Sequence, residues 1–235
     1  VVRRQRKRGI RDRAGAGYPS DRVLVIPNGK DEEQFQPLSA SDRSAARNEL
    51  GISDQAFALV YVGSIGPQYL PDGMFRFFSR LKRRRGDAKF VVLTHAVDEA
   101  RRIAHEAGVA AEDLVLRTAS AFDVPRYLAA ADAGIALRSN SFSQAAVCPI
   151  KIAEYLLCGL PVLATQGVGD LDEQLANPRA AFLLERLDEG SLDSAVGWMT
   201  DGTPSAAAAR TLGERVFGLR AAVAGYERAI ARADP

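Results

Sequence analysis

Residues 148–165, CPIKIAEYLLCGLPVLAT, decide the fold. Pro149 suits the start of a helix, Gly159 suits the left-handed position that closes one, and we predict a helix over 149–158. The apolar run PVLAT (161–165) follows directly and predicts a buried strand. A helix that leads through a glycine into a buried strand is typical of a parallel α/β sheet, so we expect the same alternation along the rest of the chain.

Short apolar runs of this kind recur along the sequence, separated by amphipathic stretches. The predicted buried strands are ALVYV (58–62), KFVVLT (89–94), LVLR (114–117), AGIAL (133–137), PVLAT (161–165) and AFLL (181–184). The predicted helices cover residues 70–83, 97–107, 124–131, 149–158 and 170–175. A further run, VLVI (23–26), ends at a Pro-Asn-Gly turn and is one more candidate strand. Six strand–helix units are too few for an eight-unit barrel. They predict an α/β fold with a doubly wound, Rossmann-like parallel sheet of about six strands and C-terminal helices.

The chain divides into three predicted parts. Residues 1–20 form a basic arm or helix, which we interpret as a solvated face; the alternative is a surface that contacts phosphates or anionic lipid headgroups. Residues 21–190 form the Rossmann-like domain, and residues 191–235 are predicted to add two helices. An apolar stripe in this tail needs either the sheet or another domain to cover it. Its members are Leu212, Val216, Leu219, Val223, Tyr226 and Ile230.

The composition excludes several classes of protein. A chain of 235 residues, 47% hydrophobic and 26% charged, buries a sizeable core, which excludes disorder and coiled coil. Its apolar runs are shorter than the roughly 18 residues that span a bilayer. Two cysteines and two histidines offer no metal-ligand spacing, so we predict no metal site and expect a cytoplasmic location. A net charge of +2 gives no general attraction to nucleic acid, and no such partner is expected.

Candidate ligand-binding residues follow the strands, because an open parallel sheet binds ligands beyond the carboxyl ends of its strands. The candidates are Gly63, Ser64 and Gly66 after the first strand, Arg117 after the third, Pro149, Ile150, Lys151 and Glu154 in the helix of 149–158, and Gly167 and Gly169 after the fifth. Glycines let a backbone approach a ligand closely, and Arg117 is available to stack on a base. The chain has no Walker P-loop, no nucleophile elbow and no G-x-G-x-x-G after its first strand.

Lys151 and Glu154 lie three residues apart and share a face in the first two turns of their helix. An anion placed there would meet the positive end of the helix, unpaired N–H groups and the ammonium of Lys151 together. Glu154, one turn further, is placed to accept from paired hydroxyls, as an acidic residue does from a nucleotide ribose. From spacing alone, a surface Lys–Glu ion pair is the simpler interpretation.

Five segments in order carry a resemblance to a known family: VIPNGKDEEQF, YVGSIGPQY, DVPRYLAAADAGIAL, CPIKIAEYLLCGLPVLAT and GVGD. Between about residues 23 and 184 the chain resembles glycosyltransferase family 4 (group 1). These are retaining enzymes of the GT-B fold, and the resemblance is strongest to the branch that builds capsular and other surface polysaccharides. It covers only the C-terminal, nucleotide-sugar-binding domain. We therefore expect this chain, which opens on Val1 and not on Met, to lack the N-terminal acceptor domain, toward which its last helix would return.

The resemblance implies transfer of a sugar from a UDP- or GDP-sugar to an acceptor hydroxyl with retention. It implies no cofactor besides the donor substrate, and a cytoplasmic location with peripheral association at the inner face of the plasma membrane through a lipid-linked acceptor. Glu154 matches the second of the family's two glutamates, which binds the donor ribose. The first is replaced by Ala146, and the two cations that usually bind the diphosphate are replaced by Ser64 and, nearby, Tyr69.

Lys151 is the candidate substitute for these cations, assisted by Arg138. In the implied mechanism Lys151 is the catalytic residue, because it stabilises the leaving diphosphate together with the helix N-terminal amides of Ile150 and Lys151. Two alternatives remain open. One is a nucleotide-sugar epimerase of the same fold, and the other is a non-catalytic Rossmann-like binding module in which Glu154 is structural.

Overall fold

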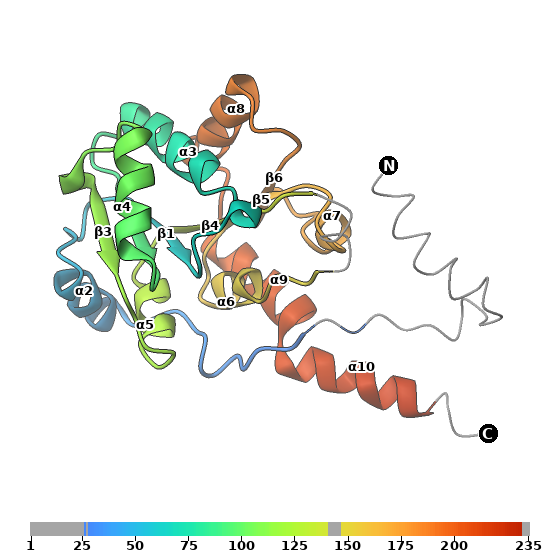
Figure 1. Ribbon diagram of the computed structural model, residues 1–235. Coiled ribbons are helices and arrows are strands. Elements are labelled where there is room, and N and C mark those ends of the chain that lie inside the picture. Colours follow the sequence, from blue (N-terminus) through green and yellow to red (C-terminus); the bar gives the residue numbers. More distant parts are fainter. Residues whose placement is uncertain (1–25, 27, 141–146, 232–235) are drawn as a thin grey trace.

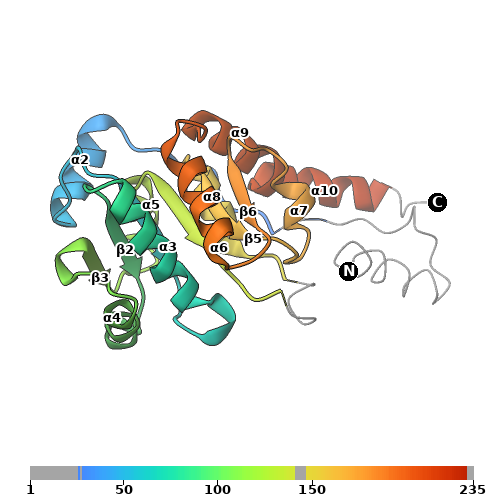
Figure 2. The same ribbon diagram turned by 90° about the horizontal axis from the view of Figure 1, so that it is seen from above.

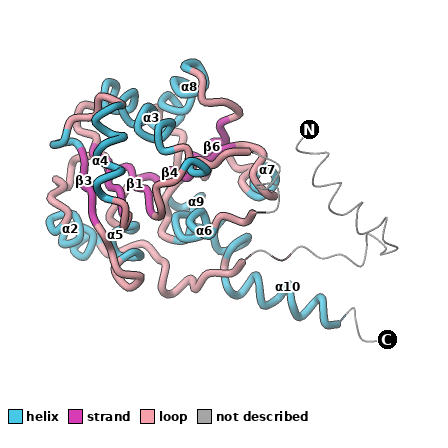
Figure 3. The backbone as a smooth tube through the Cα atoms, in the orientation of Figure 1, coloured by secondary structure: helices cyan, strands magenta, loops and turns pink. Residues whose placement is uncertain are grey.

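The computed structural model describes residues 26, 28–140 and 147–231. In these ranges six strands form one parallel sheet in the order β3-β2-β1-β4-β5-β6 (Figures 1 and 3). The strands are β1 (Ala58–Val62), β2 (Lys89–Leu93), β3 (Leu114–Arg117), β4 (Ala133–Ala136), β5 (Val162–Thr165) and β6 (Ala181–Leu184). All six predicted strands are therefore confirmed, as is the α/β class, but the edge strand β3 is half-buried along its whole length and not buried as predicted. The basic arm (1–20), most of the candidate strand 23–26 and Ala146 lie outside the described residues.

Helices cover both faces of the sheet, as the near-continuous apolar strands require. The helices are α2 (Ala40–Glu49), α3 (Pro71–Arg84), α4 (Val97–Glu106), α5 (Val124–Ala129), α6 (Ile150–Leu157), α7 (Leu171–Gln174), α8 (Glu189–Thr200), α9 (Ala206–Phe217) and α10 (Leu219–Ala231). Figure 1 shows α3, α4 and α8 on one face and α2, α5, α6 and α9 on the other, each layer with its own buried core. Figures 1 and 2 both show α10 extending away from the sheet.

Two features differ from the sequence predictions. Helix α2 was not predicted, because ASDRSAARNE has almost no apolar periodicity; it begins at a cap in which Ser39 Oγ accepts from the Asp42 amide. The described part of the tail, up to residue 231, holds three helices, so the prediction of two is wrong. Helix α8 begins at Glu189, and Gly218, in extended backbone at φ −66° and ψ 150°, separates α9 from α10.

The apolar stripe of the tail ends in solvent in the part of the chain that the structure describes. Leu212, in α9, is buried, whereas the four stripe residues of α10 are 47–64% exposed: Leu219, Val223, Tyr226 and Ile230. A neighbouring side of α10 packs on the segment around residue 30, where Gly29 lies against Ala222 and Lys30 forms a bridge with Gly218. The sheet therefore does not cover the stripe.

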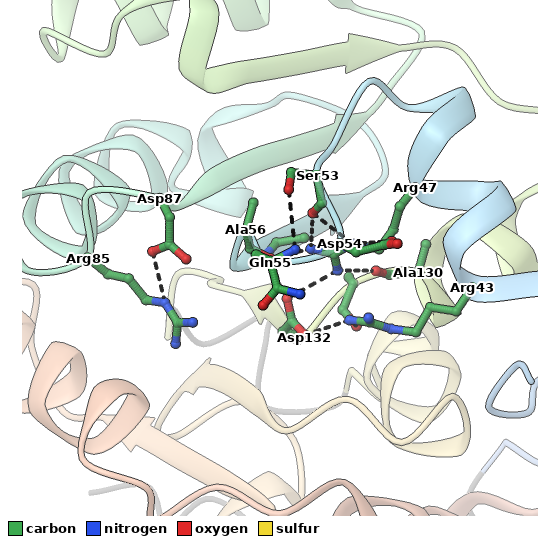
Figure 4. Close-up of polar contacts among 12 residues, drawn as sticks. Arg43, Arg47, Ser53, Asp54, Gln55, Ala56, Arg85, Asp87, Ala130 and Asp132 are labelled. Atoms are coloured by element: carbon green, nitrogen blue, oxygen red, sulfur yellow. Dashed lines mark hydrogen bonds and ion pairs between the residues drawn. The ribbon is translucent and has the colours of Figure 1, made fainter. Parts of the chain in front are cut away.

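A buried arginine holds the amino ends of β1 and β4 together (Figure 4). The side chain of Arg47 is 0% exposed, and its guanidinium lies 3.4 Å from Asp132. Asp132 also accepts from the Ala58 amide at 2.7 Å and from Arg43 at 2.6 Å. The remaining donors of Arg47 bind backbone carbonyls, those of Ser53, Ala56 and Ala130. Every partner of Arg47 is a carboxylate or a backbone carbonyl near the amino ends of these strands. The network therefore has a structural role, which is to join α2 to the amino ends of β1 and β4.

The chain order of the sheet reverses between β1 and β4, which lie side by side although β2 and β3 separate them in sequence. At such a switch point the loops after the two strands diverge to opposite faces, and the crevice between them is the usual ligand site of an open α/β sheet. The loop after β1 begins at Gly63, and Arg138 follows β4 by two residues. No described helix is long and apolar enough to cross a membrane.

Candidate functional site

The loop after β1 passes very close to the start of α6. Gly63 has φ +133°, a conformation that favours glycine, and a Cβ atom at this position would lie 2.8 Å from Lys151 Nζ. The glycine therefore makes room for the ammonium of Lys151 beside the backbone of the loop. This juxtaposition of the first predicted loop and the predicted helix start is the centre of the candidate site.

Lys151 is enclosed by two tyrosines. Its Nζ lies 4.2 Å from the ring centroid of Tyr61 and 4.5 Å from that of Tyr69, and it donates to the Tyr61 hydroxyl at 3.1 Å. The Tyr61 hydroxyl in turn donates to the Ser64 carbonyl at 2.6 Å, which ties the loop after β1 to the lysine. Two ring faces and a hydroxyl thus hold the ammonium in one position.

The pKa of Lys151 is lowered to about 8, first because burial removes water from the ammonium and second because the charge of Arg138 is close. The nearby carboxylate of Glu154 raises this pKa, but only partly offsets the other two effects. The protein groups around Lys151 only partly replace the water that burial removes from its ammonium. Such a cation is stabilised more by a bound anion than a cation in water is. The site is therefore built to receive negative charge.

Arg138 brings a second cation to the same place. Its guanidinium carbon lies 5.0 Å from the ring centroid of Tyr69, so one ring contacts both cations. Its backbone N–H donates to Thr165 Oγ1 at the end of β5, at 3.0 Å, which fixes the loop after β4. Three neighbouring strands, β1, β4 and β5, therefore contribute to one cationic cluster, which we call the Lys151 cluster: Tyr61, Gly63, Tyr69, Arg138 and Lys151.

Glu154 lies one turn beyond Lys151 on α6, and its side chain is 14% exposed. Its carboxylate pairs with the ammonium of Lys30 at 2.7 Å, not with Lys151. The surface Lys151–Glu154 pair considered from spacing alone is thus replaced by a longer-range pair. Lys30 is itself anchored, since its N–H donates to the Phe217 carbonyl and its carbonyl accepts from the Leu219 N–H, both at 2.8 Å.

The other predicted residues near the start of α6 fall into two groups. Pro149 occupies the cap position of α6, and Ile150, its first residue, is 46% exposed. Gly167 and Gly169, after β5, have φ of +82° and +52°. A Cβ on Gly169 would collide with the carbonyl of Val147, so this loop packs on the segment that enters α6. The Gly167 amide is already satisfied, because it donates to Asp172 at 2.8 Å.

Ser64 and Gly66 lie in the turn that follows Gly63. The side chain of Ser64 is exposed, and its carbonyl binds Tyr61. The Gly66 carbonyl accepts from the Tyr69 amide at 2.9 Å, which closes the turn and places the Tyr69 ring over the lysine. This loop therefore contributes mainly by positioning the tyrosines.

Arg117 is not brought to the Lys151 cluster. Its guanidinium pairs with Glu49 of α2 at 3.3 Å and lies 5.1 Å from the ring centroid of Tyr127. It ends β3, the edge strand, with β2 between it and β1. Its contact with a base stays a prediction, separate from the cluster.

Sequence reasoning missed Tyr61 and Lys30, and it considered Tyr69 only as the residue near which a cation of the family is absent. Tyr61 lies inside a buried strand, where an aromatic residue predicts only packing, and its hydroxyl reaches the site because the strand ends one residue later. Lys30 gave no signal for the site, because its position directly after Asn28-Gly29 predicts only a turn.

In the described residues, no group of three or more His, Cys, Asp or Glu side chains is arranged to hold a metal ion. The positive charge of the site is supplied by Lys151 and Arg138.

The chain is similar to a known family of enzymes and to several of its members. The family model for glycosyl transferases group 1 matches residues 42–213. Curated relatives include D-inositol 3-phosphate glycosyltransferases from Stackebrandtia nassauensis and Catenulispora acidiphila, each 28% identical, over 78% and 79% of this chain. The chain spans 42% and 44% of the length of these two relatives.

Solved structures share the fold. Anabaena HepE in complex with UDP and glucose superposes with a TM-score of 0.71 at 20% identity, covering 94% of this chain and 58% of that one. A glycosyltransferase from Rickettsia africae gives 0.74 at 15% identity, covering 93% and 59%. The C-terminal domain of a group 1 glycosyl transferase from Francisella tularensis gives 0.58 at 14% identity, covering 87% of this chain and 98% of that domain. Because the family model covers most of the sequence and the sheet is that of these neighbours, the chain belongs to the group 1 glycosyl transferases.

Proposed function

We propose that this chain is the donor-binding half of a retaining, family 4 glycosyltransferase, which transfers a sugar from a nucleoside diphosphate sugar to an acceptor hydroxyl. The observation that carries the proposal is the Lys151 cluster at the switch point, where a partly buried ammonium and the Arg138 guanidinium meet the first turn of a helix. Two cations and helix N–H groups suit a diphosphate, which carries adjacent negative charges.

In this proposal Lys151 is the catalytic residue. Charge develops on the leaving diphosphate as the glycosidic bond breaks, and a fixed cation together with the N–H groups of Ile150 and Lys151 stabilises it. Arg138 binds the same group from the loop after β4. Gly63, Ser64 and Gly66 let the backbone lie against the donor, while Pro149, Gly167 and Gly169 shape the entry to α6. Arg117 remains the candidate contact for the base.

Glu154 is proposed to bind the donor ribose through its carboxylate, with Lys30 holding one of the two oxygens. We expect the chain to bind UDP more tightly than 2′-deoxy-UDP by about tenfold, since a hydrogen bond to a charged acceptor contributes about 1.5–3 kcal/mol. In Glu154→Gln that preference should fall to about threefold or less in a calorimetric titration, because a neutral amide oxygen accepts a weaker hydrogen bond than a carboxylate does. The control is Glu214→Gln on α9, which pairs with Arg210 and should keep the preference. A Glu154→Gln variant that keeps the full preference for UDP would contradict the ribose role.

Affinity for the diphosphate should depend on pH in a defined direction. Lys151 is a cation below its pKa of about 8 and neutral above it, so the binding-competent fraction falls as pH rises. Between pH 7 and 8.5 the affinity of the chain for UDP should fall by about fourfold, and Lys151→Met should remove most of that slope. Titrations at both pH values measure this. An equal slope in the two proteins would assign the pH dependence to another group.

The acceptor side is proposed from the comparisons. The matched relatives are D-inositol 3-phosphate glycosyltransferases by name, and one is an alpha-galactosylglucosyldiacylglycerol synthase of Streptococcus pneumoniae. A structural neighbour, WaaG, is involved in lipopolysaccharide biosynthesis. These names support a role in polysaccharide or glycolipid synthesis, in the cytoplasm and with a lipid-linked acceptor at the membrane surface. The exposed stripe of α10 is the proposed contact with an N-terminal acceptor domain.

Two other functions give different results in the same assays. A non-catalytic module with a structural Glu154 would bind no nucleotide. A nucleotide-sugar epimerase would bind UDP and would convert one UDP-sugar into another without an acceptor, which product analysis detects. No acidic and basic pair suited to that reaction lies among the described residues of the Lys151 cluster, so the transferase is the function that this site supports best.

A further inference from the structure

The hydroxyl of Tyr155 lies between β1 and β4, near the carboxyl ends of these strands and beside the proposed donor site. Strands β1 and β4 are paired with Leu59 opposite Ala133 and Val60 opposite Gly134, and the pairing stops there. In a parallel ladder with this register, the next hydrogen bond would join the Val62 N–H to the Ile135 carbonyl. Instead, the Val62 N–H donates to the Tyr155 hydroxyl at 2.9 Å, and that hydroxyl donates to the Ile135 carbonyl at 3.4 Å.

The neighbouring residues make room for this arrangement. Tyr155 is fully buried, and a Cβ atom on Gly134 of β4 would collide with its ring. Burial raises the pKa of the phenol well above its usual value, so the hydroxyl keeps its proton and can donate while it accepts. Gly134 lies inside a central strand and not in a turn, so no turn accounts for a glycine here. The Tyr155 ring occupies the space that a side chain at this position would fill.

Tyr155 also links the carboxyl ends of β1 and β4 to α6, the helix proposed to bind the donor. It lies on α6, one residue after Glu154 and four after Lys151, so its hydroxyl fixes the distance of these residues from the ends of β1 and β4. Gly63 directly follows Val62, and Arg138 follows Ile135 by three residues. A change in the separation of the two strands would therefore move both loops of the Lys151 cluster.

We infer that Tyr155 is a positioning residue for the donor: its hydroxyl replaces the last hydrogen bond between β1 and β4, holds their carboxyl ends apart and sets the width of the diphosphate site. This inference rests on the proposed function of the Lys151 cluster. Tyr155 does not touch the donor, and it acts through Gly63, Arg138 and the start of α6.

The test compares Tyr155→Phe with Tyr127→Phe. Each variant keeps its ring and loses one hydrogen-bonded hydroxyl, but that of Tyr127 binds Glu49 on α2 and no strand. Both should melt at a lower temperature than the unchanged chain. Only Tyr155→Phe should lose UDP affinity, by tenfold or more, and its crystal structure should show the Val62 N–H bonded directly to the Ile135 carbonyl.

Three results would overturn the inference. The first is UDP affinity within twofold of the unchanged chain, which would leave Tyr155 a packing residue. The second is a crystal structure in which a water replaces the hydroxyl and the strands keep their separation. The third is loss of affinity without movement of the strands. If the unchanged chain binds neither UDP nor GDP, the proposed function fails, and the crystal structure of Tyr155→Phe still decides whether the hydroxyl holds the strands apart.

Discussion

Replacing Lys151 with methionine should weaken the binding of UDP by roughly a hundredfold, because a charge-assisted contact in a partly buried site contributes up to about 3 kcal/mol. Methionine keeps most of the volume between the rings of Tyr61 and Tyr69 and removes the charge. The substitution should not destabilise the fold. The pKa of Lys151 lies near 8 in the folded chain, below its ordinary value, so at neutral pH burial of the ammonium opposes folding, and the variant should melt at the same or a higher temperature.

Titration of UDP and UMP into both proteins measures the effect. If Lys151 binds the diphosphate, the variant should also lose most of the preference for UDP over UMP. The matched control is Lys89→Met at the start of β2, whose ammonium pairs with Asp113 at 3.3 Å at the opposite end of the sheet. UDP affinity within threefold of the unchanged chain in Lys151→Met would remove the lysine from the proposed site.

Arg47→Met should have the largest effect on stability, lowering the free energy of unfolding by about 3–5 kcal/mol. The guanidinium is 0% exposed, and its loss leaves the carbonyls of Ser53, Ala56 and Ala130 without their donor. Asp132 keeps the Ala58 amide and Arg43 as partners but loses the buried guanidinium of Arg47. Urea unfolding followed by circular dichroism measures the change.

Arg43→Met is the control for this network. Its side chain is 31% exposed and pairs with the same Asp132, and a solvent-accessible pair contributes only about 1 kcal/mol or less. Equal destabilisation by the two variants would show that the buried position of Arg47 does not matter. Since the Arg47 network lies at the amino ends of β1 and β4, away from the Lys151 cluster, a variant that still folds should bind UDP as the unchanged chain does.

The sheet was predictable because its strands are short apolar runs bounded by turn residues, and the residues of the four central strands are almost all buried. The residues of runs such as ALVYV and PVLAT are enough to predict a buried strand. Gly159 was predicted to end a helix, and its φ of +77° is the left-handed conformation expected there. Helix α2 carries no such signal. It is stabilised by its Ser39 cap and by the burial of Arg47, and an arginine in a charged stretch predicts solvent, not a core.

The candidate site was predictable only in part. Lys151 follows from its place in the first turn of a helix that faces the carboxyl ends of the strands. Its enclosure by Tyr61 and Tyr69 depends on the φ of Gly63 and on the turn that closes at Gly66, which are tertiary features. The partner of Glu154 could not be found by helical spacing, because Lys30 lies far away in sequence and is positioned by its bridge to Gly218.

The most direct test of the central claim is calorimetric titration of the unchanged chain with UDP, GDP and ADP at pH 7. We predict that at least one of the three binds with a dissociation constant between micromolar and millimolar, about 4 to 8 kcal/mol of binding free energy. The diphosphate should bind more tightly than the matching monophosphate. Absence of binding by all three at millimolar concentration would contradict the claim that the Lys151 cluster in this chain is a nucleotide-sugar site.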